Sequence, residues 1–429
     1  MLYENLDVTL SVVLAPETRI DIPDRANPPA GIPREALASA PDCPALCAFP
    51  IPEGVPLPPP ASFGFGESQA SARFPVVSVK PEGGLRRYLF PAAFPAFPLQ
   101  SCDAGFIDSL QIDGGDDRVR WPASQRAEAQ GADGEPDLML HGFYRYEWAD
   151  SVISAKATPE ADGSTTLVLD HAPYYGMIEV NRCRLVNTFH ALVPGHYYLD
   201  RARRLLFLAE VPDGVLTLAS EIAGPRFDLE NEDGVTFRNC EFHDIRCVAV
   251  RARNCRDLAF EDCVFECIGG HVLDILDCAN FRMERCRVRD TSAGAVYVKA
   301  GDRRTLAPGN ALIRHCHFER MGRLSSTYVP ALEFAGVGNT VERCEFADMP
   351  SSAVRYDGNC HRITRNFFHD LVLVSDDQGA VETFGDPLRR HDLRERRRGQ
   401  HDHPFVMEGL RCGAEPWRWA ERRQEQPDP

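Results

Sequence analysis

The sequence predicts an all-β protein whose main part is a right-handed parallel β-helix, with an antiparallel β module inserted. The first observation is a short element that recurs from about residue 228, at spacings of 23, 23, 30, 28 and 22 residues. Repeats of this length are typical of solenoids. The second is a content of 32 glycines and 33 prolines, which favours short strands and turns over long helices. With 44% hydrophobic and 26% charged residues, the chain can bury a substantial core.

The recurring element is Cys-x-Phe or a close variant. Its first position holds Cys240, Cys263, Cys286, Cys316, Cys344 and, in the last copy, Asn366. A small side chain that returns once per coil stacks on its neighbours inside a solenoid, so we predict one buried column. Disulfides would need an oxidising compartment and close Cα spacing, and a metal site would need a tighter cluster. The structural ladder is therefore the favoured interpretation.

Each repeat also contains a short strand in which apolar and polar residues alternate. Its middle, outward-facing positions are Arg251, Asp274, Tyr297, Glu333, Arg355 and Glu382. A period of two is the pattern of a strand that is buried on one face. Successive copies, about 4.8 Å apart, would form a parallel sheet with right-handed crossovers. We therefore place the β-helix at about 221–385.

The other regions lack the repeat. Residues 107–215 show short strand patterns separated by turn signals, such as Asp162–Gly163, and predict a separate β-rich insertion domain. Residues 1–106 are rich in proline, and we expect loops and edge strands there. Residues 386–429 are rich in arginine and lack alternation. We expect them to be a flexible tail that adds no coil and whose removal leaves thermal unfolding nearly unchanged.

Charge and hydrophobicity exclude two classes of partner. The formal net charge is −16, from 47 basic and 63 acidic residues, which does not suit a nucleic-acid binder. No run of about 18 uncharged apolar residues occurs, so we expect no membrane span. The N-terminus carries Glu4 and Asp7 where a signal peptide needs positive charge, so no cleaved signal is evident. We expect a monomer.

The outward column contains the residue types that a sugar polymer needs in a groove along a sheet. Carboxylates exchange protons, tyrosine contacts sugar rings, and arginine binds hydroxyls or acidic sugars. The next outward position adds Arg253, Lys299 and Asp357. An ordinary solvated sheet face would show a similar alternation, so the pattern alone leaves both interpretations open.

Five sequence blocks between about 110 and 386 are more specific than the repeat. They are LHGFYRYEWADSV (140–152), VNTFHALVPGHYYLDRARRLLFL (186–208), GDRRTLAPGN (301–310), TYVPALEFAGVGN (327–339) and SDDQGAVETFGD (375–386), and VRWP (119–122) fits with them. In this order they resemble glycoside hydrolase family 141, whose members are right-handed, pectin-lyase-like β-helices with a β-rich insertion domain. The resemblance implies hydrolysis of a cell-wall-type polysaccharide or oligosaccharide. It also suggests secretion.

The resemblance and the column together rank the candidate catalytic residues. Asp377 ranks first because it lies in the densest family motif, and Glu333 ranks second from its place in the column. Glu382 ranks third because it stands where the family usually has an aromatic residue. Two strand spacings, about 9.6 Å, separate the backbones of Glu333 and Glu382. The expected substrate-binding residues are Arg355, Tyr297, Asp274, Lys299, Asp357 and Arg251.

No cofactor is expected, although one ion is chemically compatible with the sequence. Asp376–Asp377 offers the oxygen ligands that calcium uses, and it equally fits a turn in which aspartate bonds its own backbone. Calcium therefore stays an alternative to a simple turn.

Three departures from the family keep other functions open. Lys299–Ala300–Gly301 replaces the usual Gly-Gly before Asp-Arg, Glu382 replaces an aromatic residue, and the arginine-rich tail replaces further coils. A non-catalytic β-helix that binds carbohydrate or protein is one alternative. A polysaccharide lyase, with Lys299 or Arg355 as base or cation, is the other.

Overall fold

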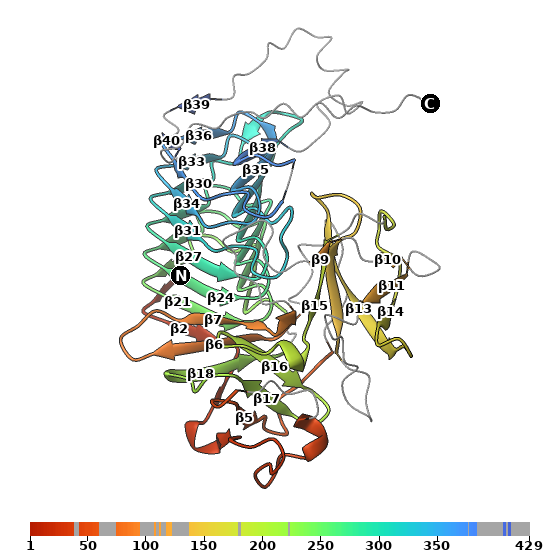
Figure 1. Cartoon of the computed structure of the whole chain (residues 1–429). Coiled ribbons are helices and arrows are strands. Elements are labelled where there is room, and N and C mark those ends of the chain that lie inside the picture. The colour runs from red at the N-terminus through yellow and green to blue at the C-terminus, as the bar shows by residue number, and fades with distance from the viewer. Residues whose placement is uncertain are drawn as a thin grey trace, which may run out of the picture.

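The computed structural model describes residues 1–37, 43–59, 74–94, 107–108, 111–112, 117–121, 137–178, 182–221, 224–375, 377–383, 406–408 and 411–412. Figure 1 shows a tall column of stacked coils, with one sheet at its lower end and another beside it. The helical elements described are short 3₁₀ turns: η1 (Pro16–Thr18), η2 (Arg34–Leu37) and η4 (Phe189–Ala191). None of the described helices is long and apolar enough to cross a membrane.

The stacked coils form a parallel β-helix with three sheets, as the repeat predicts. Sheet 1 stacks β1 (Leu2–Glu4), β20 (Thr236–Arg238), β23 (Ala259–Glu261), β26 (Arg282–Glu284), β30 (Leu312–Arg314), β33 (Thr340–Glu342), β36 (Arg362–Thr364) and β39 (Val406–Glu408). Sheet 2 stacks β2 (Asp7–Thr9), β21 (Glu241–Ile245), β24 (Val264–Ile268), β27 (Arg287–Thr291), β31 (His317–Glu319), β34 (Glu345–Ala347), β37 (Phe367–Phe368) and β40 (Arg411–Cys412). Sheet 3 stacks β19 (Phe227–Glu230), β22 (Val250–Arg253), β25 (Leu273–Leu276), β28 (Val296–Asp302), β32 (Leu332–Val337), β35 (Val354–Asn359) and β38 (Val381–Thr383), and β29 (Ala307–Pro308) pairs with β28.

The predicted Cys/Asn column lies inside the helix. Its six side chains, Cys240, Cys263, Cys286, Cys316, Cys344 and Asn366, are each at most 3% exposed. The backbone N–H of Cys286 donates to Cys316 Sγ over 3.4 Å, and that of Cys344 donates to Asn366 Oδ1 over 2.8 Å. The described cysteines form no disulfide with one another. The structural interpretation of the cysteines is confirmed.

The residue directly before each Cys/Asn position in the sequence forms a sharp corner between sheet 1 and sheet 2. The corner residues are Asn239, Asp262, Arg285, His315, Arg343 and Arg365, and all have positive φ, between 51° and 57°. Asn and Asp tolerate this left-handed conformation better than most residues. The corner lets a strand of sheet 2 begin directly after a strand of sheet 1, so the coil stays narrow.

The first coil is built from the N-terminus, which the sequence pattern did not reveal. β1 pairs in parallel with β20, and β2 pairs in parallel with β21. The ring of Tyr3 stacks on Phe237 at a centroid distance of 4.8 Å, which extends the internal aromatic ladder by one coil. The chain then leaves the helix and returns at β19, so the segment between β2 and β19 is one long insertion.

The insertion contains two further sheets. Sheet 4 has the order β3 (Val12–Leu14), β18 (Gly214–Ala219), β6 (Val76–Pro81), β7 (Arg87–Pro91), β16 (His196–Asp200), β17 (Leu205–Leu208), β5 (Cys47–Pro50) and β4 (Ile20–Asp21). Sheet 5 has the order β10 (Gln111–Ile112), β11 (Arg118–Trp121), β14 (Thr165–Leu169), β13 (Asp150–Pro159), β12 (Met139–Phe143), β15 (Arg182–Val186) and β8 (Ala93–Phe94), and β9 (Ile107–Asp108) also pairs with β15. The expected boundaries at 106 and 215 therefore fall within sheets, because strands far apart in sequence pair with one another.

Two segments of the arginine-rich tail lengthen the helix. β39 pairs in parallel with β36, and β40 pairs in parallel with β37. The expectation that residues 386–429 add no coil is wrong for these segments. The open edges of the last strands carry backbone donors and acceptors, and pairing satisfies them. The rest of the tail lies outside the described residues.

A buried ionic network joins sheet 4 to the face of sheet 2. The Arg86 guanidinium donates to Asp244 over 2.7 Å and to Glu266 over 3.1 Å. Arg289 donates from Nε to the other oxygen of Glu266 over 2.8 Å, and Ser78 donates to Asp244 over 2.6 Å. Arg86 is 7% exposed, and both carboxylates are at most 2% exposed. One arginine of the insertion thus contacts two buried carboxylates of the β-helix.

We expect Arg86→Met to lower the free energy of unfolding by about 3–5 kcal/mol, because it leaves buried carboxylates short of a cation. Arg87→Met is the matched control, since the side chain of Arg87 is 41% exposed and pairs with exposed Asp213. The control should lose at most about 1 kcal/mol. Urea denaturation of both variants is the measurement. Equal losses would show that the network contributes little to docking of the insertion.

Candidate functional site

The outer face of sheet 3 carries the column of side chains that the sequence predicts. The ladder pairs each middle residue with the next, in the order Asp228, Arg251, Asp274, Tyr297, Glu333, Arg355 and Glu382. These positions are partly or fully exposed, whereas strand neighbours such as Leu273 and Ile275 are fully buried. Successive residues lie one strand spacing apart, about 4.8 Å. The register of the column is therefore the one expected from the repeat.

The lower part of the column is held by ion pairs. Asp274 accepts a hydrogen bond from His271 Nδ1 over 2.9 Å when that nitrogen is protonated. The other oxygen of Asp274 lies 3.8 Å from Arg251 Nε. Two predicted substrate-binding residues, Arg251 and Asp274, thus contact each other. They lie on neighbouring rungs, below Tyr297.

The second outward column is less continuous than the first. Its ladder runs through Glu230, Arg253, Leu276, Lys299, Ala335 and Asp357, so apolar residues interrupt it twice. Lys299 lies 3.7 Å from Asp277, and Asp357 lies 3.4 Å from Arg303. Asp302 accepts a hydrogen bond from the Arg304 backbone N–H over 2.8 Å, while Arg303 reaches across to Asp357.

The upper end of the column contains a group of carboxylates around one arginine. Glu333, Arg355 and Glu382 occupy three successive rungs. Burial raises the pKa of the neighbouring Tyr297 hydroxyl, and the negative charge of Glu333 raises it further. Glu333 is thus a half-buried carboxylate between a tyrosine and an arginine.

Glu382 has the carboxyl group best suited to keep a proton. Burial raises its pKa above the ordinary value, and the nearby negative charge of Asp377 adds to this. A hydrogen bond from the Gly379 N–H, 3.3 Å from Oε1, and the charge of Arg355 act in the opposite direction without cancelling the rise. Asp377 itself is exposed, with φ of 56°, at the turn that precedes β38. Its neighbour Asp376 lies outside the described residues.

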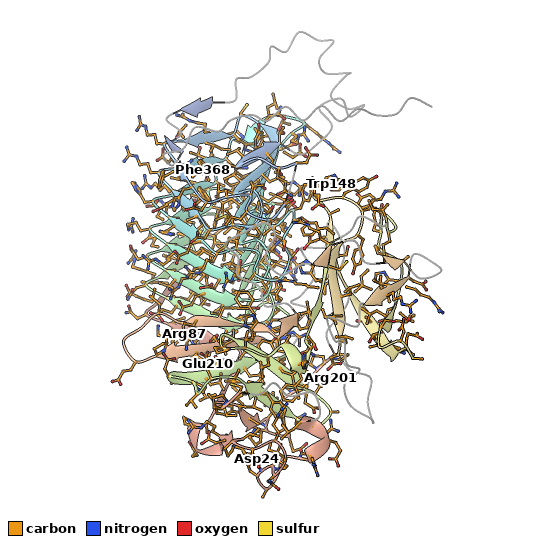
Figure 2. The ribbon with its side chains drawn as sticks, viewed as in Figure 1. Asp24, Arg87, Trp148, Arg201, Glu210 and Phe368 are labelled. Carbon is orange, nitrogen blue, oxygen red and sulfur yellow. The ribbon has the colours of Figure 1, made fainter. Side chains whose placement is uncertain are left out.

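An aromatic residue that the sequence reasoning did not select completes this end of the column. Tyr328 lies in the loop between β31 and β32, and its ring centroid is 5.1 Å from the guanidinium carbon of Arg355. Trp148, from the insertion, meets the Tyr328 ring edge to face at 6.3 Å. Figure 2 shows Trp148 at the end of the insertion that lies beside the upper coils. Tyr144, from the same insertion, is a core residue with 2% exposure.

The loop that carries Tyr328 is fixed by Asp150 of β13. The carboxylate of Asp150 accepts hydrogen bonds from the Ser326 backbone N–H over 2.9 Å and from the Thr327 hydroxyl over 2.5 Å. It also lies 2.8 Å from His141 Nε2. Because Arg184 donates to His141 Nδ1 over 2.9 Å, the proton of the neutral imidazole is on Nε2 and points to Asp150.

Burial and charge keep this chain of contacts in one protonation state. Burial lowers the pKa of His141, and the neighbouring Arg184 charge lowers it further, so the ring stays neutral. Burial alone would raise the pKa of Asp150, but its hydrogen bonds from His141 and the loop hold that pKa below its ordinary value. Asp150 is therefore a buried carboxylate that joins the insertion to the β-helix.

The structure thus groups four of the expected residues and separates the others. Glu333, Arg355, Glu382 and Asp377 lie at the upper end, and Tyr297 adjoins them one rung below Glu333. The described residues contain no group of three or more His, Cys, Asp or Glu side chains placed to hold a metal ion. Calcium at Asp376–Asp377 stays an untested prediction.

Comparison with known proteins supports the fold. The family model described as "Right handed beta helix region" matches residues 217–323. A solved structure titled "Glycoside hydrolase" is 13% identical, covers 89% of this chain and 72% of that chain, and has a TM-score of 0.63. The structure titled "Catalytic domain of GH87 alpha-1,3-glucanase in complex with nigerose" is 9% identical over 95% of this chain and 76% of that chain, with a TM-score of 0.31. No curated protein matches. The first structure supports a shared β-helix fold, and the second carries no argument.

We expect Asp150→Asn to lower the free energy of unfolding by about 1–3 kcal/mol, because an amide N–H would face donors from the loop or from His141. The Asp150 carboxylate stabilises the fold above its unfolded-state pKa, near 4, and this contribution is lost as the pH falls through the lower folded-state value. The variant should therefore lose most stability near neutral pH and least in acid. Thermal unfolding from pH 3 to 7 is the measurement.

Asp162→Asn serves as the control for this experiment, because its side chain is 58% exposed and lies in the same insertion. A smaller loss is expected for it at every pH. If Asp150→Asn were no more destabilised than Asp162→Asn, the carboxylate would not fix the loop.

Proposed function

We propose that the protein hydrolyses glycosidic bonds in an oligosaccharide or polysaccharide that lies along the outer face of sheet 3. The single observation that carries this proposal is the pair of carboxyl groups Glu333 and Glu382, separated by the rung of Arg355. Glycosidases use two carboxyl groups that divide the roles of acid and base. The sequence blocks that resemble glycoside hydrolase family 141 point to the same reaction.

Glu382 is the proposed general acid. Its raised pKa keeps the carboxyl protonated to a higher pH than an ordinary glutamate, so it can protonate the leaving oxygen. Asp377 contributes by its negative charge, which disfavours ionisation of Glu382. Arg355, on the rung between Glu333 and Glu382, is proposed to bind sugar hydroxyls near the scissile bond.

Glu333 is the proposed base that activates water. Its backbone lies two rungs, about 9.6 Å, from that of Glu382. Inverting glycosidases place their carboxyl groups about 6.5–9.5 Å apart, which this backbone separation allows. That separation admits a water molecule and corresponds to inversion of the anomeric centre. Asp377 is the second candidate for the base, because it lies next to Glu382 and is exposed.

The lower part of the first column and the second outward column provide the proposed binding surface for the rest of the sugar chain. Tyr297 offers a ring face one rung below Glu333. Arg251, Asp274, Lys299 and Asp357 offer charged groups whose present partners are other side chains of the protein. In a complex they would exchange part of these contacts for sugar hydroxyls.

A screen across neutral and acidic polysaccharides tests the reaction type. We expect new reducing ends without absorbance of unsaturated products. Unsaturated products would identify a lyase instead. Binding without turnover on any substrate would identify a carbohydrate-binding protein and would reject the hydrolase.

The pH profile of an accepted substrate tests the acid. Turnover should fall as the pH rises through the raised pKa of Glu382, because the acid then loses its proton, and should fall at low pH as the base gains one. Glu382→Gln should lower kcat by about 10²–10⁴ and remove the alkaline limb. An aryl glycoside with a good leaving group should recover much of the lost rate, since its departure needs no proton.

The base is tested by Glu333→Gln and Asp377→Asn beside the control Glu345→Gln, whose half-exposed carboxylate lies on sheet 2. The variant that removes the base should lose about 10²–10⁴ in kcat on every substrate, including the aryl glycoside. Asp377→Asn should in addition move the alkaline limb to lower pH, because Glu382 loses a negative neighbour. Near wild-type rates in both variants would place the chemistry elsewhere on the helix.

A further inference from the structure

The end of the insertion nearest the upper coils carries a cluster of aromatic rings outside its hydrophobic core. Tyr146 stacks on Trp148 at 5.0 Å with an interplanar angle of 9°, and Tyr175 meets both rings edge to face, at 5.4 and 5.2 Å. Tyr174 adds a fourth ring, 4.8 Å from Tyr175. Trp148 then contacts Tyr328 of the β-helix. We name these five residues the aromatic platform.

We propose that the aromatic platform binds a pyranose ring of the sugar chain beside Arg355 and Glu382, as an additional subsite. This inference rests on the proposed function, because it gives the same substrate a further contact on the insertion. The ligand is an oligosaccharide longer than a disaccharide, since it must occupy both the carboxyl end of the column and the platform.

Exposure is the first argument for a ligand. Tyr174 is 79% exposed and Tyr146 is 38% exposed, although both belong to a packed ring cluster. Aromatic rings that stay in water form apolar surface, and clustered exposed apolar surface marks a binding site more often than single residues do. The same insertion buries Tyr144 almost completely, so it has a core in which aromatic rings can be covered.

The backbone of Tyr328 is the second argument. Its φ is 51°, in the left-handed region that a bulky side chain rarely adopts. The bonds from Ser326 and Thr327 to Asp150 hold the two preceding residues and so over-determine this conformation. Conformations of this kind concentrate at ligand sites, where the surrounding structure maintains them. The result is a Tyr328 ring set between Arg355 and Trp148.

The surrounding charges indicate which ligand fits. Burial raises the pKa of the Tyr328 hydroxyl, and the nearby negative charges of Glu382 and Asp377 raise it further, so the platform adjoins the carboxyl groups. An apolar protein partner covering this area would have to bury those carboxylates without new partners, at considerable cost. A sugar ring places its C–H face on an aromatic ring and its hydroxyls on charged groups. A saccharide therefore matches both parts of the surface.

Affinity electrophoresis in gels with and without dissolved polymer tests the subsite, with xylan as a neutral polymer and polygalacturonate as an acidic one. The Glu382→Gln background prevents degradation of the polymer. In it, Trp148→Ala and Tyr174→Ala should each weaken binding about three- to tenfold. Phe367→Ala is the matched control, because this aromatic residue is 37% exposed on sheet 2. The control should bind as the background variant does.

Tyr174→Ala should fold normally, because so exposed a side chain contributes little to packing. A loss of binding in this variant therefore does not come from misfolding. In the active protein, Trp148→Ala should raise KM for long oligosaccharides more than KM for the shortest accepted substrate. Weaker binding in the platform variants without hydrolysis of any polymer would support the subsite and reject the proposed reaction. If the protein hydrolyses a polymer but the platform variants bind and turn over as Phe367→Ala does, the subsite is rejected and the proposed reaction is retained. No binding of either polymer by the background variant would overturn the subsite as well.

Discussion

The parallel hydrogen-bond ladder between coils is the constraint on which the other features depend. Each strand of sheet 3 pairs in register with the next, from β19 to β38. Because side chains alternate between the two faces of a strand, a shift by one residue would turn the inner Leu273 outward and the outer Asp274 inward. The buried cysteines and asparagine return at the same place in each repeat, which is consistent with one register throughout the helix.

Because of this register, the outer face of sheet 3 presents different sets of charged side chains at its two ends. Arg251 and Asp274 lie on adjacent rungs and neutralise each other. Two rungs above Asp274, Glu333 has a tyrosine below and an arginine above, and Glu382 follows beyond that arginine. The same types of side chain therefore have different electrostatic environments at the two ends. Burial and the neighbouring Asp377 distinguish Glu382 by raising its pKa.

The insertion adds residues beside the upper end of this face, such as Trp148. It is fixed to the helix at two distant places, through Arg86 at the lower coils and through Asp150 at the loop before β32. Both contacts bury charged groups against opposite charges or hydrogen-bond donors, which makes the position of the insertion specific. Trp148 can therefore meet Tyr328 at a defined distance, although 180 residues of chain separate them.

The sequence by itself determined the solenoid, the internal Cys/Asn column and the outward register of six side chains, because these features repeat locally and periodicity records them. Only the tertiary structure decided which of those side chains are paired, that β1 and β2 form the first coil, and that β39 and β40 extend the last ones. It also brought Tyr328 and Trp148 to the carboxyl end of the column. Tyr328 lies within a block that resembles a known family, yet its place beside Arg355 goes with a left-handed backbone and with the hydrogen bond from the preceding Thr327 to Asp150. Contacts between distant single residues have no period, so a repeat pattern carries no record of them.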